Sequence, residues 1–193
     1  MKKYSKDAIT DIVNYSAKDS IVFYATGEAY LYGEAKVGYQ TMELTSDHIM
    51  LNTDSSIVHA RSGVDSTGNP VNLPVFKDGA ESYESESIDF NFKTKKGLIR
   101  NVVTQQGDGY VTSEKAKKME DNTFLMKNAK YTTCDNHKHP HFYLNLTKAK
   151  VKPKEYIVAG PAYLVIQDVP LPLALPFGFF PFTEKYTSGI LMP

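Results

Sequence analysis

Apolar and polar residues alternate along much of the chain with a period of two. The clearest examples are residues 88–92 (IDFNF) and 142–146 (FYLNL), and residues 29–31 (AYL) form a shorter one. Successive side chains of a strand point to opposite faces, so this alternation is typical of strands with one buried face. Glycines, several of them next to Pro, Asn or Asp, occur at short intervals along the chain. The pattern predicts an all-β sandwich, barrel or roll.

Few segments depart from this pattern. Residues 6–15 and 113–121 are weak candidates for short helices, the first because of apolar spacing and the second because it is rich in Lys and Glu. Residues 62–79 concentrate Gly, Asn, Ser and Pro, which predicts a surface loop inserted into the series of strands.

A weak internal repeat accompanies the strands. Residues 19–23 (DSIVF), 47–51 (DHIML) and 86–90 (ESIDF) are similar, with a fainter copy at 114–116 (EKA). Residues 33–37 (GEAKV), 128–131 (NAKY) and 160–164 (GPAYL) form a second recurring element. A spacing of roughly 30 to 40 residues suggests stacked strand pairs, which bury a continuous interior only together. The alternative is that these are chance similarities, which any β-rich chain shows.

Composition narrows the functional classes. The 193 residues suffice for one domain with a sizeable core, and 22 Lys+Arg against 22 Asp+Glu give no net charge, so nucleic acid is not an expected partner. The single cysteine, Cys134, cannot form an internal disulfide. No 18-residue apolar run predicts a membrane-spanning helix, and no secretory signal follows Met1.

The segment from residue 161 to 182 is the most unusual part of the chain. Asp168 is its only charged residue, and four prolines fall within residues 169–182. Proline lacks an N–H and fixes φ, so this stretch is predicted to be neither a regular helix nor a central strand. An extended apolar segment is expected to lie against a core, a lipid surface or a partner.

Three stretches, in order, resemble the lipopolysaccharide-assembly outer-membrane protein family (LptD/OstA). They are residues 130–134 (KYTTC), residues 160–166 (GPAYLVI) running on through the Pro-rich segment to 182, and residues 188–193 (SGILMP). The resemblance is specific over about the last third of the chain. Where the family commonly has a tryptophan after the cysteine strand, this chain has His141, Phe142 and Tyr143.

The resemblance implies an open, twisted β-jellyroll of stacked antiparallel strand pairs at the periplasmic face of the outer membrane. Its apolar interior would receive the lipid A acyl chains of lipopolysaccharide and pass them to a membrane barrel. The implied partners are lipopolysaccharide, the barrel with its plug lipoprotein, and the periplasmic bridge component of the pathway. The implied role is transport, with no cofactor and no catalytic residues. Cys134 matches a cysteine that the family joins to its barrel by a disulfide.

We therefore expect residues 1–168 to form the jellyroll domain, and residues 169–193 to form an apolar junction that leads to a barrel absent from this chain. The expected lipid-binding residues are the inward positions of alternating strands: Ile49, Leu51, Ile88, Phe90, Phe92, Leu144, Leu146, Leu164 and Ile166. The expected membrane-junction residues are Val169, Pro170, Leu171, Pro172, Phe177, Phe179 and Phe180. The N-terminal edge, near residues 21–25, is expected to pair with a strand of the bridge component.

Other readings of the residues compete with this one. His137, His139 and His141 alternate near Cys134 and Asp135 and could bind Zn²⁺, but Pro140 disturbs such a strand and we expect no metal. No nucleophile or phosphate-loop motif suggests an enzyme. Two alternatives remain: a closed carrier barrel and a glycan-binding roll. A glycan site would use exposed aromatics such as Tyr30, Tyr32 and Tyr39.

Overall fold

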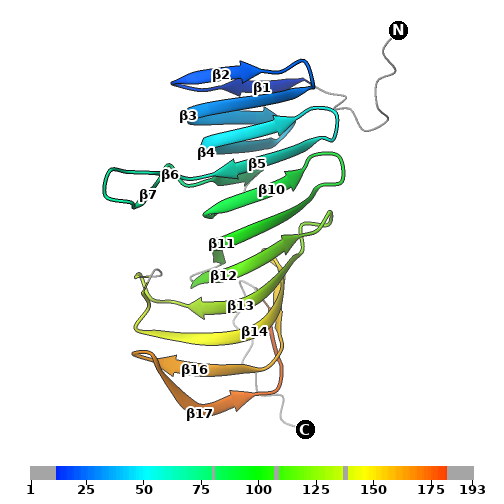
Figure 1. The fold of residues 1–193 in the computed structure, drawn as a ribbon. Coiled ribbons are helices and arrows are strands. Elements are labelled where there is room, and N and C mark those ends of the chain that lie inside the picture. Colours follow the sequence, from blue (N-terminus) through cyan, green and yellow to red (C-terminus); the bar gives the residue numbers. More distant parts are fainter. Residues whose placement is uncertain (1–11, 80, 107–108, 137–138, 182–193) are drawn as a thin grey trace.

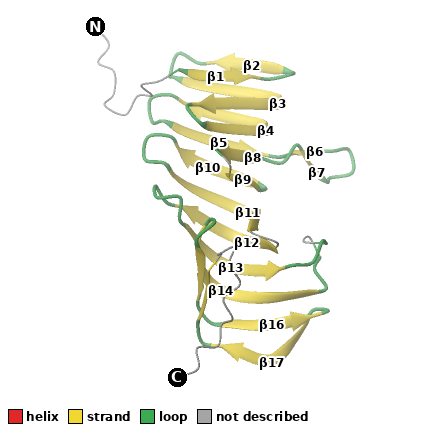
Figure 2. Ribbon diagram, turned by 180° about the vertical axis from the view of Figure 1, so that it is seen from behind, coloured by secondary structure: helices red, strands yellow, loops and turns green. Residues whose placement is uncertain are grey.

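The computed structural model describes residues 12–79, 81–106, 109–136 and 139–181. All regular secondary structure in these ranges is strand, drawn as a stack of arrows from the N-terminal to the C-terminal end (Figures 1 and 2). The strands form a 16-stranded antiparallel sheet and one separate two-stranded hairpin. The predicted all-β class and the absence of helix from most of the chain are therefore confirmed for the described residues.

Long strands run through the whole stack and give the roll its shape. Each bends near its middle, and in four of the six the two halves pair with different neighbours on one side. For example, one half of the first long strand pairs through Tyr30 with β2 (Ser20–Phe23), and the other half pairs through Val37 with β1 (Val13–Ser16). The long strands are β3 (Glu28–Tyr39), β4 (Met42–Asn52), β11 (Lys96–Gln106), β12 (Gly109–Lys118), β13 (Phe124–Thr132) and β14 (Phe142–Lys152).

The halves of the long strands, with shorter strands between them, build two facing layers. Layer A adds β2 (Ser20–Phe23), β5 (Ile57–Arg61), β10 (Ser87–Asn91), β15 (Tyr156–Ala159) and β18 (Gly178–Pro181). Layer B adds β1 (Val13–Ser16), β8 (Val75–Asp78), β9 (Glu81–Glu84), β16 (Ala162–Ile166) and β17 (Val169–Leu175). Stacked antiparallel pairs folded into two layers are the predicted jellyroll.

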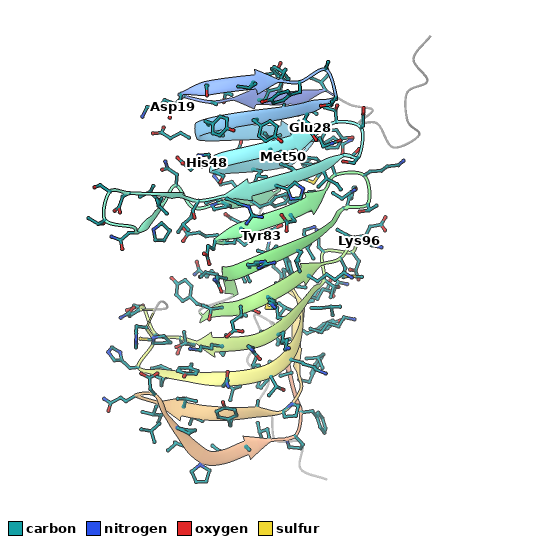
Figure 3. The ribbon with its side chains drawn as sticks, in the orientation of Figure 1. Asp19, Glu28, His48, Met50, Tyr83 and Lys96 are labelled. Carbon is teal, nitrogen blue, oxygen red and sulfur yellow. The ribbon has the colours of Figure 1, made fainter. Side chains whose placement is uncertain are left out.

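The bends coincide with the acidic residues of the sequence repeat. Asn101 and Asn128 have positive φ, and their side-chain amides donate hydrogen bonds to Glu86 and Glu114. Asp19 lies against Gly33, where an added Cβ would come within 2.2 Å of its Oδ2. Gly33 also has a positive φ, and any side chain there would collide with Asp19. The acidic residues of the repeat therefore lie where the strands change layer. In Figure 3, Asp19 and Lys96 lie on opposite sides of the stack.

Two local predictions were wrong. Residues 113–118 form part of β12 and are not helical, because pairing with β11 and β13 overrides their helix propensity. The predicted loop contains a projecting hairpin of β6 (Gly63–Val64) and β7 (Pro70–Val71), but Val75–Asp78 is strand β8 of the main sheet (Figure 1). Of the other helix candidate, residues 13–15 lie in β1 and residues 6–11 lie outside the described residues.

The core lies between the two layers. In its N-terminal two thirds, aromatic rings bridge the layers: Phe76 of β8 is 4.9 Å from Phe90 of β10, and it stacks on Tyr83 at 5.1 Å. Phe124 lies 5.4 Å from Tyr83, and Phe92 lies 5.4 Å from Phe90. All five are at most 4% exposed, so this part of the interior is filled by side chains.

The proline-rich segment lies at the end of both layers. β17 pairs with β16 and β18 pairs with β15, and neither has a second neighbouring strand among the described residues. Edge positions are where proline is tolerated in a sheet, since one side of the strand needs no N–H donor. The segment is therefore extended, as predicted, and residues 182–193 lie outside the described residues.

Candidate binding cavity

The interior of the roll has unfilled space at its C-terminal end. A cavity of about 290 Å³ lies there between the two layers. Its lining is almost wholly apolar and comes from β13, β14, β15 and β18: Tyr131, Leu144, Leu146, Ile157, Phe179, Phe180 and Pro181. No charged side chain lines it, and the Tyr131 hydroxyl is the one polar side-chain group among these residues, so the cavity offers a mainly apolar surface.

Small side chains pair with the residues around the cavity. Leu146 of β14 pairs with Ala129 on one side and with Ala162 on the other. On layer A, Ala149 pairs with Ala159. An alanine occupies less space than a larger residue would. In the N-terminal part of the interior, aromatic rings fill the space between the layers, whereas these positions have alanine. Phe180 pairs with Ile157, so β18 forms the wall of the cavity on layer A.

The predicted lipid-binding residues divide into three groups. Leu144 and Leu146 line the cavity. Leu164 is half-buried and pairs with Leu144, whereas Ile166 is 43% exposed. The pairing of β16 with β17 is irregular between Tyr163 and Val165. Val165 is 3% exposed but pairs with Tyr143, so it lies on the opposite face of the sheet from Leu144 and Leu164. The remaining five are at most 3% exposed and belong to the filled core: Ile49, Leu51, Ile88, Phe90 and Phe92.

Sequence reasoning missed Tyr131 and Ile157 as cavity residues. Ile157 lies in a four-residue strand, and Tyr131 stands out in the sequence only as part of the internal repeat and of the family resemblance. Both alternate with polar or exposed neighbours, which was the available signal. Their meeting across the interior depends on strand register, which a local pattern does not contain.

The predicted junction residues separate into exposed and lining positions. Val169 and Phe177 are 60% and 73% exposed, and Pro170 and Pro172 lie with half-buried Leu171 on the edge strand β17. Phe179 and Phe180 belong to β18 and line the cavity. The segment therefore both covers the cavity and presents apolar side chains to the surroundings.

The remaining candidate chemistry is sparse. Cys134 is half-buried, with its Sγ 3.5 Å from Nδ1 of His141. Across the described residues, no three His, Cys, Asp or Glu side chains are grouped as a metal site, and His137 lies outside them. The aromatics of the glycan alternative do not share a surface, because Tyr39 is buried against Phe92 at 5.3 Å. None of the described segments is a helix suited to crossing a membrane.

The fold and the cavity define an all-β roll that can hold an apolar ligand between its layers. The family model described as "LptD protein" matches residues 157–193. The chain is 24% identical over 171 residues to the LPS-assembly protein LptD of Acinetobacter baumannii, and 28% identical over 113 residues to that of Acinetobacter baylyi. These alignments cover 86% and 57% of the chain but only 19% and 14% of the relatives.

A solved structure is also similar: LptH, the LptA-homologous periplasmic component of the lipopolysaccharide transport device from Pseudomonas aeruginosa. The TM-score is 0.45 at 12% identity, over 56% of this chain and 76% of that one. The sequence matches confirm the predicted resemblance to the periplasmic N-terminal domain of the LptD/OstA family. The chain spans less than a fifth of the length of these curated relatives.

Proposed function

We propose that this chain takes part in lipopolysaccharide transport at the periplasmic face of the outer membrane, by holding acyl chains in the interior of the roll. The observation that carries the proposal is the apolar cavity at the C-terminal end. Ile157, Phe179, Phe180 and Pro181 line it, and all four fall within the segment that resembles LptD. The proposed role is transport and requires no catalytic group.

The energetics of such a site favour movement over tight capture. Each methylene that leaves water contributes about 0.8 kcal/mol. A cavity of about 290 Å³ is near the lower limit for ligand pockets, so it would hold part of a lipid at one time. Passage from the N-terminal end would require Phe76, Phe90 and Phe124 to move aside, since these rings fill the interior above the cavity.

Competition with an apolar fluorescent dye tests this function. We expect lipopolysaccharide to displace the dye from the interior, whereas its oligosaccharide, freed of acyl chains, should leave the dye bound. The contrast separates acyl-chain binding from the glycan-binding alternative. Displacement by the oligosaccharide alone, or no displacement by lipopolysaccharide, would overturn the proposal.

We further propose that β2 accepts a strand from the periplasmic bridge component. All four residues of β2 are exposed, and β2 pairs with β3 alone in the described sheet. The amide of Tyr24 donates to the Glu28 carbonyl at 2.9 Å, so by the antiparallel alternation Val22 faces β3 and the N–H of Ile21 faces outward. An outward N–H is the group that strand addition uses.

Replacing Ile21 by proline tests this edge. Ile21→Pro removes an outward N–H, and we expect affinity for the purified bridge component to fall about three- to tenfold, the equivalent of one net hydrogen bond. Ile21→Thr is the matched control, because it loses the apolar side chain but keeps the N–H. Calorimetric titration measures both, and equal affinities for the two variants and the unaltered chain would exclude β2 as the contact.

Three finer points belong to the same proposal. Cys134 would form a disulfide with a cysteine outside this chain, and its half-buried place in the β13–β14 connection leaves the sulfur accessible. The exposed apolar residues of 169–181 would lead to a membrane barrel. The barrel and its plug lipoprotein would then receive the lipid from the cavity.

A further inference from the structure

The outer surface of layer A carries a row of cations at its C-terminal half. Arg100 pairs with Lys115, Lys115 with Lys127, and Lys127 with Lys148. These four residues therefore lie directly opposite one another on four consecutive strands, β11 to β14, and all four are exposed. They are far apart in the sequence, and only the strand register aligns them.

This arrangement is unfavourable for the isolated domain, because like charges directly opposite on adjacent strands destabilise a sheet. Within the described part of the chain, none of the four takes part in a salt bridge. The chain as a whole is neutral, so the positive charge of this surface is balanced elsewhere. The nearest acids at the bends, Glu86 and Glu114, accept hydrogen bonds from asparagines.

A second row, beside the first, alternates apolar residues with lysines. Its members pair in register across six strands: Leu98, Lys117, Leu125, Lys150, Val158 and Phe179. The four apolar members are between 38% and 60% exposed. Leu125, Lys150 and Val158 line an open groove of about 470 Å³ with Lys127 and Lys148. We call the two rows together the basic face.

Asp89 of β10 pairs with Leu98 at the end of the second row and contacts His59 at 2.7 Å. Two further acids lie close to the basic face. Asp121, in the β12–β13 turn, accepts hydrogen bonds from the hydroxyl and the amide of Thr123, which hold its pKa below the ordinary value, with a smaller contribution from Lys150. Glu155 pairs with Lys152 at 2.9 Å. Both lie in turns at the margin, so they leave the centre of the basic face positive.

We propose that the basic face docks on the surface of an anionic phospholipid bilayer. A bilayer surface supplies diffuse negative charge, and its interfacial region accepts apolar side chains between cations. A nucleic acid or an acidic protein would match the charge but would leave Leu125, Val158 and Phe179 without an apolar environment. Charge complementarity and the interleaved apolar row therefore favour lipid. The inference does not depend on transport through the interior.

The basic face and the cavity share two strands. Val158 of β15 lies on the outer surface, and its partner Phe179 of β18 is 60% exposed and also borders the cavity. Ile157 and Phe180 on the same two strands line the cavity. Docking would place the cavity one sheet thickness from the bilayer, about 10 Å. The wall between them is formed by a four-residue edge strand.

Flotation with lipid vesicles tests the proposal on the 193-residue chain. We expect the chain to float with phosphatidylcholine vesicles that contain phosphatidylglycerol, and not with vesicles of phosphatidylcholine alone. Each lysine near an anionic surface contributes about fivefold in partitioning. Changing Lys115, Lys127, Lys148 and Lys150 together to glutamine should therefore reduce partitioning by at least about tenfold.

The matched control changes four lysines outside the basic face to glutamine: Lys18, Lys36, Lys77 and Lys130. It alters net charge equally and should float like the unaltered chain, with circular dichroism verifying that both variants fold. Equal flotation of the two variants would overturn the proposal. So would flotation that needs lipopolysaccharide in the vesicles and ignores phosphatidylglycerol, because a phosphorylated saccharide would then be the ligand.

Discussion

Replacing Phe90 by alanine is expected to lower the free energy of unfolding by about 3–5 kcal/mol. Phe90 is 1% exposed and bridges the layers, with its ring 4.9 Å from Phe76 and 5.4 Å from Phe92. The buried Lys118 ammonium lies 5.8 Å from the ring centroid and would lose that contact as well. Removing the ring would leave a cavity between two sheets that cannot collapse without shifting both.

Leu98→Ala is the matched control for Phe90→Ala. Leu98 lies on the neighbouring strand β11 but is 41% exposed on the outer surface, so we expect a loss of less than about 1 kcal/mol. Urea unfolding of both variants, with an unchanged m-value, measures the difference. A loss below about 1 kcal/mol for Phe90→Ala would contradict a filled N-terminal interior and would indicate an open trough along the whole roll.

The strands were largely predictable from the sequence because their signal is local. The alternation in residues 88–92 places Ile88, Phe90 and Phe92 on one face, and all three are buried. The acidic residues of the repeat were also recognisable, because each begins a short pattern of neighbouring residues. The structure places them at the bends. Strand β8 does not follow from the local pattern because Val75–Asp78 is only four residues long, and one of its two partners, β4, comes from a distant part of the chain.

The cavity and the basic face were not predictable in the same way, because both are products of register. Tyr131 and Phe180 meet across the interior from strands that no short pattern connects. Lys115, Lys127 and Lys148 look like ordinary solvated lysines in the sequence, and they become a row only when β12, β13 and β14 are aligned. A one-residue slip in the register of β13 would turn Lys127 to the interior, and the row of cations would be interrupted.

The second large effect is expected from a photo-reactive phenylalanine analogue placed at Tyr131 or at Lys130. Tyr131 lines the cavity, and its aromatic side chain is similar in shape to the analogue. Lys130 is the preceding residue of β13, is exposed, and lies over the outer ring of Tyr143 at 4.5 Å. Adjacent residues of a strand face opposite sides, so the two positions sample the interior and the exterior at the same height of the roll.

Crosslinking of lipopolysaccharide from these two positions tests most directly whether acyl chains occupy the interior. The account predicts strong capture of lipopolysaccharide from position 131 and only background capture from position 130. Capture should be lost when lipopolysaccharide is replaced by its deacylated saccharide. Equal capture from both positions, or capture from position 130 alone, would contradict an interior acyl-chain site and place the ligand on the outer surface of layer B.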